Sequence, residues 1–122
     1  MRLIGTPTPQ SFSLAVMGSK YIWEFGFLLL LGGALAPLKE EIFFRSIIYP
    51  PLRKALGRGK GMFVAGILFA VLHFDMIRFI PLLLGGIVLS WLYEKSESIW
   101  PSIIAHGTWN IFMASALWIQ RF

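Results

Sequence analysis

Two adjacent glutamates and an arginine interrupt an otherwise apolar part of the chain, at Glu40, Glu41 and Arg45. Ionisable groups in apolar surroundings are costly, and they usually face a cavity or a partner. Glu41 and Arg45 stand four positions apart in the favourable acid-first order, so on a helix they can form a structural ion pair. Glu40 is rotated by about 100° from Glu41 on such a helix. Glu40 therefore lacks a basic partner on its own helix, and we expect it to be the glutamate that does chemistry.

Three further polar side chains, His73, His106 and Asn110, also fall within apolar segments. A single histidine at a helix end is most often satisfied at an interface. His106 and Asn110 share one helical face and could simply hydrogen-bond a neighbouring helix. Together with Glu40, however, two imidazoles and a carboxamide form a set that can activate water and stabilise an oxyanion. That combination is harder to explain by four unrelated structural roles.

Other hydrolase designs are missing from the sequence. Asp75 is the only aspartate, so one chain cannot supply a pair of catalytic aspartates. There is no Gly-x-Ser-x-Gly elbow and no His-Glu-x-x-His zinc helix. The chain has no cysteine, which excludes disulfides, thiolate zinc sites and cysteine nucleophiles. If the chain is an intramembrane hydrolase, glutamate and histidine remain as its chemical groups, with or without a metal.

The surroundings of these side chains indicate a membrane. The chain has 122 residues, of which 57% are hydrophobic and 14% charged, whereas soluble domains have about 45–50% apolar and about 25% charged residues. Three stretches carry no Asp, Glu, Lys or Arg: 61–74, 79–93 and 98–120. The first two are shorter than the about 20 residues that a membrane span needs, so they must extend into flanking residues or the bilayer must thin locally. The alternative is a set of buried helices in a soluble bundle.

We therefore predict an all-α fold, a polytopic membrane helix bundle of about four to five helices. The expected helical segments are 23–36, 37–56, 62–74, 79–93 and 101–118. Pro37 suits the first turn of a new helix, and Pro50 with Pro51 is expected to bend or break that helix. Residues 1–20 are predicted to be an interfacial N-terminal tail, and 21–122 a single membrane-embedded domain.

The basic residues suggest an orientation in the membrane. The formal net charge is +5, and its densest cluster, Arg53, Lys54, Arg58 and Lys60, lies between two apolar segments. Basic residues concentrate in cytoplasmic loops, so we place this loop in the cytoplasm and expect no nucleic acid partner. A simple topology then sets Glu40 towards the opposite side from this loop. At least one segment must be tilted, re-entrant or broken if the polar groups are to meet, which is permitted where backbone lines a cavity.

Three motifs resemble those of a known family. The stretch 40–45 matches Glu-Glu-x-x-x-Arg, 69–73 matches Phe-x-x-x-His, and 106–110 matches His-x-x-x-Asn. Their order and separation resemble the type II CAAX prenyl endopeptidases and bacteriocin-processing enzymes, also called the CPBP or ABI family. The resemblance covers roughly residues 35–114, and three motifs in order on apolar helices are a strong signal. One helix precedes the first motif here, where family members usually have more, which suggests a minimal member, a truncated chain or one completed by a further subunit or oligomer.

The resemblance implies a polytopic membrane protease and assigns roles to the polar set. Glu40 would be the catalytic glutamate and would polarise water together with His73, while His106 and Asn110 would stabilise the oxyanion. Glu41 and Arg45 would be structural or supporting residues. No cofactor is favoured, but Glu40, His73 and His106 are the residues that would ligate zinc if the enzyme uses it.

The resemblance also implies partners and a location. It predicts contact with membrane lipid, a peptide or protein substrate that is prenylated or carries a leader peptide, and a place in a prokaryotic cytoplasmic membrane. Two other functions remain open at this stage. The polar set could serve binding in a non-catalytic membrane or immunity protein, or protonation of Glu40 could belong to a small transporter subunit.

Overall fold

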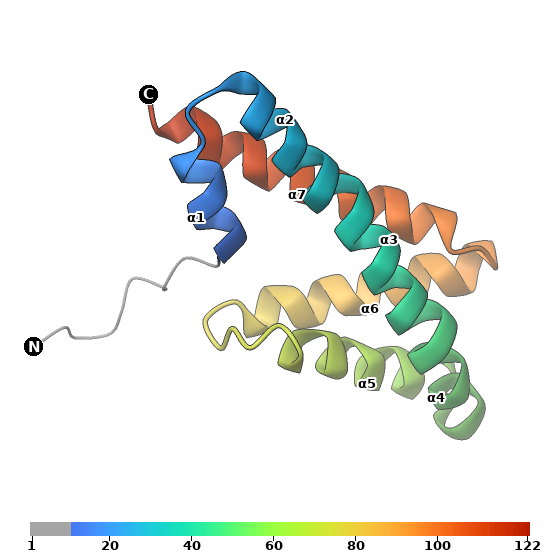
Figure 1. The fold of residues 1–122 in the computed structure, drawn as a ribbon. Coiled ribbons are helices and arrows are strands. Elements are labelled where there is room, and N and C mark those ends of the chain that lie inside the picture. Colours follow the sequence, from blue (N-terminus) through green and yellow to red (C-terminus); the bar gives the residue numbers. More distant parts are fainter. Residues whose placement is uncertain (1–10) are drawn as a thin grey trace, which may run out of the picture.

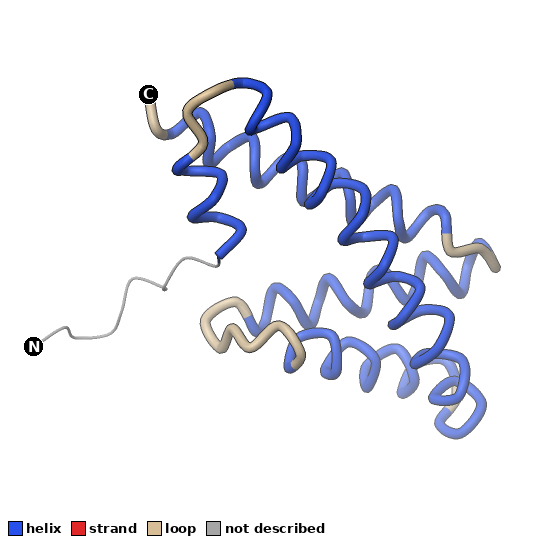
Figure 2. Tube along the Cα trace, in the orientation of Figure 1, coloured by secondary structure: helices blue, strands red, loops and turns tan. Residues whose placement is uncertain are grey.

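The computed structural model describes residues 11–122, and all regular structure within that range is helical. The all-α prediction is therefore confirmed. Figures 1 and 2 show a long helical run beside a C-terminal helix, with a hairpin of two helices set at an incline to both. The elements are α1 (Ser11–Gly18), α2 (Ile22–Leu30), η1 (Leu31–Leu35), α3 (Ala36–Glu41), η2 (Ile42–Ile48), α4 (Tyr49–Leu56), α5 (Arg58–Val71), α6 (Phe79–Ser96) and α7 (Trp100–Gln120).

The first two predicted helices are one continuous helical run over residues 22–56. Pro37 does not start a separate helix, because the preceding residues remain helical in the wider π form. The N–H of Ala36 donates to the carbonyl of Leu31, five residues back, which defines that form in η1. Pro50 and Pro51 occupy the first turn of α4 and do not break the run either. The segment with Glu40 and Glu41, α3, thus lies between two π segments, η1 and η2.

The α5–α6 hairpin agrees with the predicted third and fourth helices to within a few residues. Its helices approach closely at glycines, since a Cβ on Gly86 would lie only 2.9 Å from the Cα of Gly66. The turn that leads into α5 uses Gly57 at φ 85°, a left-handed conformation that suits glycine. Such small residues permit close helix packing in membrane proteins.

The fifth predicted helix is α7, which packs against η1, α3, α6 and α1. Two apolar clusters hold these elements together. One joins α1, α2 and α7 through Val16, Phe25 and Ala114. The other joins η2, α5 and α6 through three larger side chains, Phe44, Phe69 and Leu89. α1 falls in the predicted N-terminal tail, whose first ten residues lie outside the described range.

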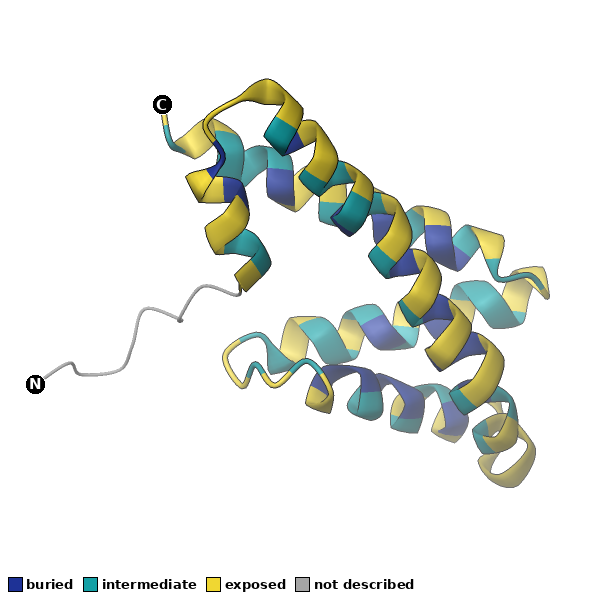
Figure 3. Ribbon diagram, in the orientation of Figure 1, coloured by how far each residue is buried: buried dark blue, intermediate teal, exposed yellow. Residues whose placement is uncertain are grey.

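The distribution of polarity is inverted relative to a soluble domain. Glu41 and Arg45 are fully buried, and His106 is 8% exposed. Large apolar side chains cover the outside of every long helix, for example Trp23, Ile80 and Ile104, each at least 60% exposed. Figure 3 shows how exposed positions dominate the outer faces. A polar interior within an apolar exterior fits the predicted setting of the site.

Within residues 11–122, no helix combines the length and the apolar character that crossing a membrane requires.

Candidate active site

Glu40 lies between both histidines of the chain. Its Oε2 atom is 3.7 Å from Nε2 of His73 and 3.4 Å from Nε2 of His106. The three side chains come from different elements: Glu40 from α3, His73 from the end of the hairpin after α5, and His106 from α7. Figure 1 shows the α5–α6 hairpin inclined to the helical run that carries Glu40. The structure therefore brings together three of the four residues assigned to catalysis.

Glu41 has a second function that sequence reasoning missed. As predicted, it pairs with Arg45, with 3.2 Å between Oε2 and Nε, and both side chains are fully buried. In addition, its Oε1 lies 2.8 Å from Nδ1 of His106. The imidazole of His106 thus spans the two adjacent glutamates. The signal was present in the sequence, since neighbouring carboxylates about 100° apart on a helix can flank one ring.

Arg45 connects the glutamates to the hairpin. Its Nη2 donates a hydrogen bond to the carbonyl of Gly86 at 3.2 Å. Its guanidinium carbon also lies 5.1 Å from the ring centre of Phe69, within the range of a cation–π contact. Because Phe69 precedes His73 by one helical turn, the Glu41–Arg45 pair helps to fix the position of His73 as well.

The hydrogen bonds around the two rings constrain the protons of the site. Nδ1 of His73 is 2.5 Å from the carbonyl oxygen of Phe69, which can only accept, so Nδ1 donates. Nδ1 of His106 faces one carboxylate oxygen of Glu41, whose other oxygen pairs with Arg45, so we assign the proton of this contact to Nδ1. Both Nε2 atoms then face Glu40. A proton held by Glu40 or by either Nε2 makes these contacts attractive, which is the arrangement of an acid–base centre.

Asn110 occupies the same face of α7 as His106, as expected, but its side chain is engaged elsewhere. Its Nδ2 donates to the carbonyl oxygen of Gly32 in η1 at 2.8 Å. The fourth predicted site residue therefore contacts the helical run just before α3. Its relation to Glu40 is indirect, through the packing of α7 on that run.

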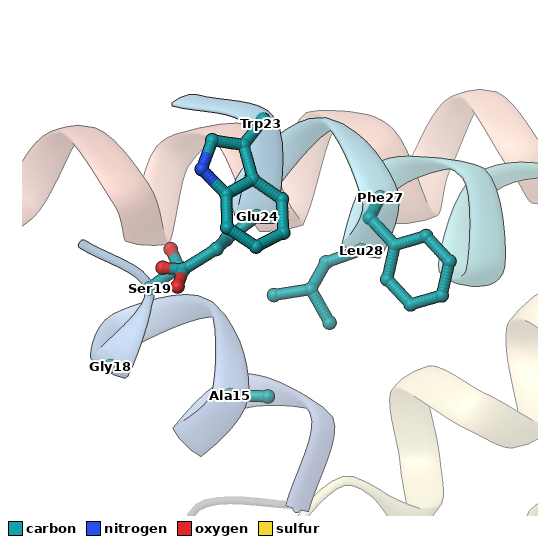
Figure 4. A pocket seen from close by; sticks show the side chains of 7 residues that line it. All are labelled: Ala15, Gly18, Ser19, Trp23, Glu24, Phe27 and Leu28. Atoms are coloured by element: carbon teal, nitrogen blue, oxygen red, sulfur yellow. The ribbon is translucent and has the colours of Figure 1, made fainter. Parts of the chain in front are cut away.

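A separate open pocket of about 410 Å³ lies between α1 and α2 (Figure 4). Its one carboxylate, Glu24, accepts hydrogen bonds from the backbone N–H groups of Lys20 and Tyr21, at 2.6 and 3.2 Å. That carboxylate therefore caps the start of α2. The pocket has no part of the Glu40 site in its lining, and we assign no chemistry to it.

A second ionic cluster joins α4, α5 and α6 at the ends that are predicted to face the cytoplasm. Glu94 accepts a hydrogen bond from Tyr49 at 2.7 Å and from Nε of Arg53 at 2.8 Å, and Nε of Arg58 lies 2.8 Å from its other oxygen. Burial acts to raise the pKa of the Glu94 carboxyl, but the hydrogen bonds from Tyr49 and Arg53 outweigh it and hold the pKa below its ordinary value. The expected basic loop is wrong as a loop, because Arg53 and Lys54 lie in α4 and Arg58 and Lys60 in α5, with only Gly57 between the helices. The acidic partner, Glu94, was not predicted from the sequence.

Zinc ligation by Glu40, His73 and His106 was the alternative considered from the sequence. Among residues 11–122, no group of three or more histidine, aspartate or glutamate side chains is arranged to hold a metal ion. Nδ1 of each ring contacts Phe69 or Glu41, as is also usual for metal-ligating imidazoles, and Nε2 of each ring faces Glu40.

Comparison with known proteins places the chain in a family. Residues 22–112 match the family described as type II CAAX prenyl endopeptidase Rce1-like. UPF0177 protein YxdF of Lactococcus lactis subsp. lactis (strain IL1403) is 29% identical over 70% of the chain and 47% of its own length. YdiL of Bacillus subtilis (strain 168), whose name makes it a candidate membrane peptidase, is 26% identical over 70% of the chain and 35% of its length.

A human relative also matches. CAAX prenyl protease 2 of Homo sapiens is 35% identical over 51% of the chain and 20% of its own length. The matched region thus covers less than half of each of these three relatives. No solved structure matches the chain.

Proposed function

Because the chain belongs to the type II CAAX prenyl endopeptidase Rce1-like family, we propose that it is an intramembrane endopeptidase that hydrolyses a membrane-associated peptide or protein. The approach of Glu40 Oε2 to two imidazoles, at 3.4 and 3.7 Å, is the observation that carries this proposal. These distances exceed those of direct hydrogen bonds, and catalytic contacts often tighten only when substrate is bound. In the proposal, the water molecule and the scissile carbonyl enter beside these three groups.

Glu40 and His73 form the base of the proposed mechanism. Glu40 removes a proton from water, whose oxygen attacks the carbonyl carbon and forms a C–O bond. The carbonyl electrons move onto oxygen, and that oxyanion accepts hydrogen bonds from Asn110 and from Nε2–H of His106, whose ring carries both protons in this step because Nδ1–H is held by Glu41. When the tetrahedral intermediate collapses, the C–N bond breaks and the proton held by Glu40 or His73 passes to the leaving amine. Each residue has the role that was expected for it from the sequence, and the proposed steps need no metal.

Glu41 and Arg45 support this chemistry without touching the substrate. The carboxylate of Glu41 fixes the Nδ1–H of His106, so Nε2 of that ring is directed to Glu40. Arg45 pairs with Glu41 and donates a hydrogen bond to the carbonyl of Gly86 on α6. A carboxylate that orients an imidazole through Nδ1–H and stabilises its doubly protonated form is a recurrent device in hydrolases.

The substrate class follows from the family and from the surface. The family name and the human relative's name indicate CAAX prenyl proteins, and the bacteriocin-processing members named by the sequence resemblance indicate leader peptides. An apolar exterior around a polar centre would admit a lipid-anchored chain end from the bilayer. We place the protein in a prokaryotic cytoplasmic membrane with the 53–60 segment on the cytoplasmic side, acting alone, as an oligomer or with a further subunit.

Peptide cleavage followed by mass spectrometry tests the proposal. The purified chain in detergent would be incubated with prenylated C-terminal peptides and double-glycine leader peptides, as wild type, Glu40→Gln and Glu97→Gln. Glu97 is exposed at the end of α6 and makes a matched control for the same chemical change. We expect cleavage by the wild type and the control, and a loss of at least about a thousandfold in Glu40→Gln, the scale of removing a central catalytic group.

The other outcomes have distinct meanings. Equal cleavage by wild type and Glu40→Gln would place the activity in a contaminant or another site. A folded wild type that cleaves no peptide in the panel would favour a non-catalytic binding or immunity role for the same polar cluster.

A further inference from the structure

The carbonyl of Gly32 has lost its helical partner. In an α-helix it would accept from the N–H of residue 36, four positions on. The N–H of Ala36 instead donates to Leu31, because η1 is a π segment. In the π pattern the donor for Gly32 would be residue 37, which is proline and has no N–H. Gly32 is buried, and a buried carbonyl without a donor is costly.

Asn110 supplies the missing donor. Its Nδ2 lies 2.8 Å from the Gly32 oxygen, across the contact between α7 and η1. One turn earlier on α7, Gly107 lies against the same segment so closely that a Cβ there would collide with the carbonyl oxygen of Gly33. Pro37 also borders this contact, because its Cγ would lie 3.8 Å from that Cβ. The π turn, the proline and the glycine together create one hydrogen bond between α7 and the run that carries Glu40.

We propose that the Gly32 carbonyl positions Asn110 for the oxyanion, and that Pro37 is the residue that makes this carbonyl available. An asparagine amide has two N–H donors. When the Gly32 carbonyl accepts one of them, the amide can no longer rotate freely. The second N–H then points in one fixed direction, in which it can donate to the reacting oxygen. The inference rests on the proposed function.

The same helical run then orients both oxyanion donors. Glu41 in α3 holds His106 through Nδ1, and Gly32 in η1 holds Asn110 through Nδ2. Glu40, the proposed base, lies on this run as well. Main-chain and carboxylate contacts from residues 31–41 thus fix the position of the proposed base relative to the two oxyanion donors. π segments are rare and occur frequently at functional sites, which agrees with this use.

The side-chain amide of Asn110 can be observed by itself, because it is the only asparagine in the chain. The full chain would be labelled with ¹⁵N-asparagine in detergent micelles and its side-chain amide exchange with water measured by NMR. Pro37→Ala restores an N–H at residue 37 that competes for the Gly32 carbonyl. We expect the Asn110 amide to exchange about tenfold faster, the effect of losing one typical hydrogen bond.

Matched controls separate this effect from general loosening. Pro81 lies in the first turn of α6, where a missing N–H is without consequence, so Pro81→Ala should leave the exchange unchanged. Gly107→Ala provides a second route, because the added Cβ would push α7 away from Gly33 and should also accelerate exchange. Gly85 has no atom within 4 Å of its would-be Cβ, so Gly85→Ala is its control.

The peptide cleavage assay supplies the second arm. A positioning role predicts that Pro37→Ala lowers kcat by about tenfold to a hundredfold with KM nearly unchanged, since an oxyanion donor acts in the transition state. Unchanged exchange in both Pro37→Ala and Gly107→Ala overturns the Gly32–Asn110 contact. Faster exchange with wild-type kcat overturns the positioning role. If the wild type cleaves no peptide, the proposed function and the oxyanion role of Asn110 are both overturned. The amide exchange of Asn110 still tests its hydrogen bond to Gly32 in that case.

Discussion

His106 lies between two carboxylates of different character. Glu41 is fully buried and already paired with Arg45, whereas the side chain of Glu40 is 28% exposed and lies beside both imidazoles. In the proposed mechanism, one carboxylate orients the ring and the other exchanges a proton with it. The two adjacent glutamates can take separate roles because the helix turns them towards different neighbours.

The two functions of Glu41 can be separated by mutation. Glu41→Leu leaves Arg45 buried without its carboxylate, so we expect the free energy of unfolding to fall by about 3–5 kcal/mol. The double variant Glu41→Leu/Arg45→Met replaces the pair by apolar groups and should recover most of that stability. Cleavage should stay low in both, because Nδ1 of His106 has lost its acceptor. Denaturant unfolding and the peptide assay measure the two effects.

Recovery of cleavage in the double variant would contradict the orienting role. Glu41 would then be a structural partner of Arg45 and nothing more, which is the simpler interpretation available from the sequence.

Residue spacing alone predicted much of this site. Four-residue separations identified the Glu41–Arg45 pair, and the absence of a basic partner singled out Glu40. The contact of Glu41 with His106 and that of Asn110 with Gly32 were missed. Both join residues more than sixty positions apart, and helical spacing carries no information about which faces of two distant helices meet.

At the scale of elements, the helices were predictable and the π segments were not. Charge-free stretches located α5, α6 and α7 to within a few residues. Residues 22–56 were divided at Pro37 because proline usually starts or breaks a helix. The continuous run exists because η1 changes the hydrogen-bond pattern before the proline and Asn110 satisfies the carbonyl left over. That solution depends on α7, which local sequence cannot reveal.

The junction of α4, α5 and α6 should depend on pH. The pKa of Glu94 is lowered from 4.5 in the folded protein, so its ion pairs contribute stability above the unfolded pKa. That contribution is lost as pH falls through the folded pKa. We expect the difference in unfolding free energy between wild type and Glu94→Gln to narrow below about pH 4.5. The contributions of the other carboxylates are the same in both proteins and cancel in this difference. A difference in unfolding free energy that stays constant from pH 6 to about 3 would show that the protonation of Glu94 is not linked to folding.

At the scale of the whole molecule, polarity and charge are separated in space. Glu41, Arg45 and His106 are buried, large apolar side chains face outward, and the basic segment 53–60 lies at one end of the hairpin. Membrane proteins with enclosed polar sites share this organisation. Gly57 with the first turn of α5, and the α5–α6 turn at 72–78, lie at opposite ends of α5. Their accessibilities therefore report the orientation of the whole domain.

The absence of cysteine makes that orientation measurable. Gly59→Cys places a thiol in the first turn of α5, within the basic segment, where a Cβ meets nothing within 4 Å. Met76→Cys places one in the turn at the opposite end, where the side chain is 83% exposed. A membrane-impermeant maleimide applied to intact spheroplasts should label Met76→Cys at once and Gly59→Cys only after the membrane is opened, because basic loops stay in the cytoplasm. The unmodified chain is the blank. Labelling of both thiols from outside would mean that α5 does not separate two compartments, and the proposed site would then have to work at a membrane surface.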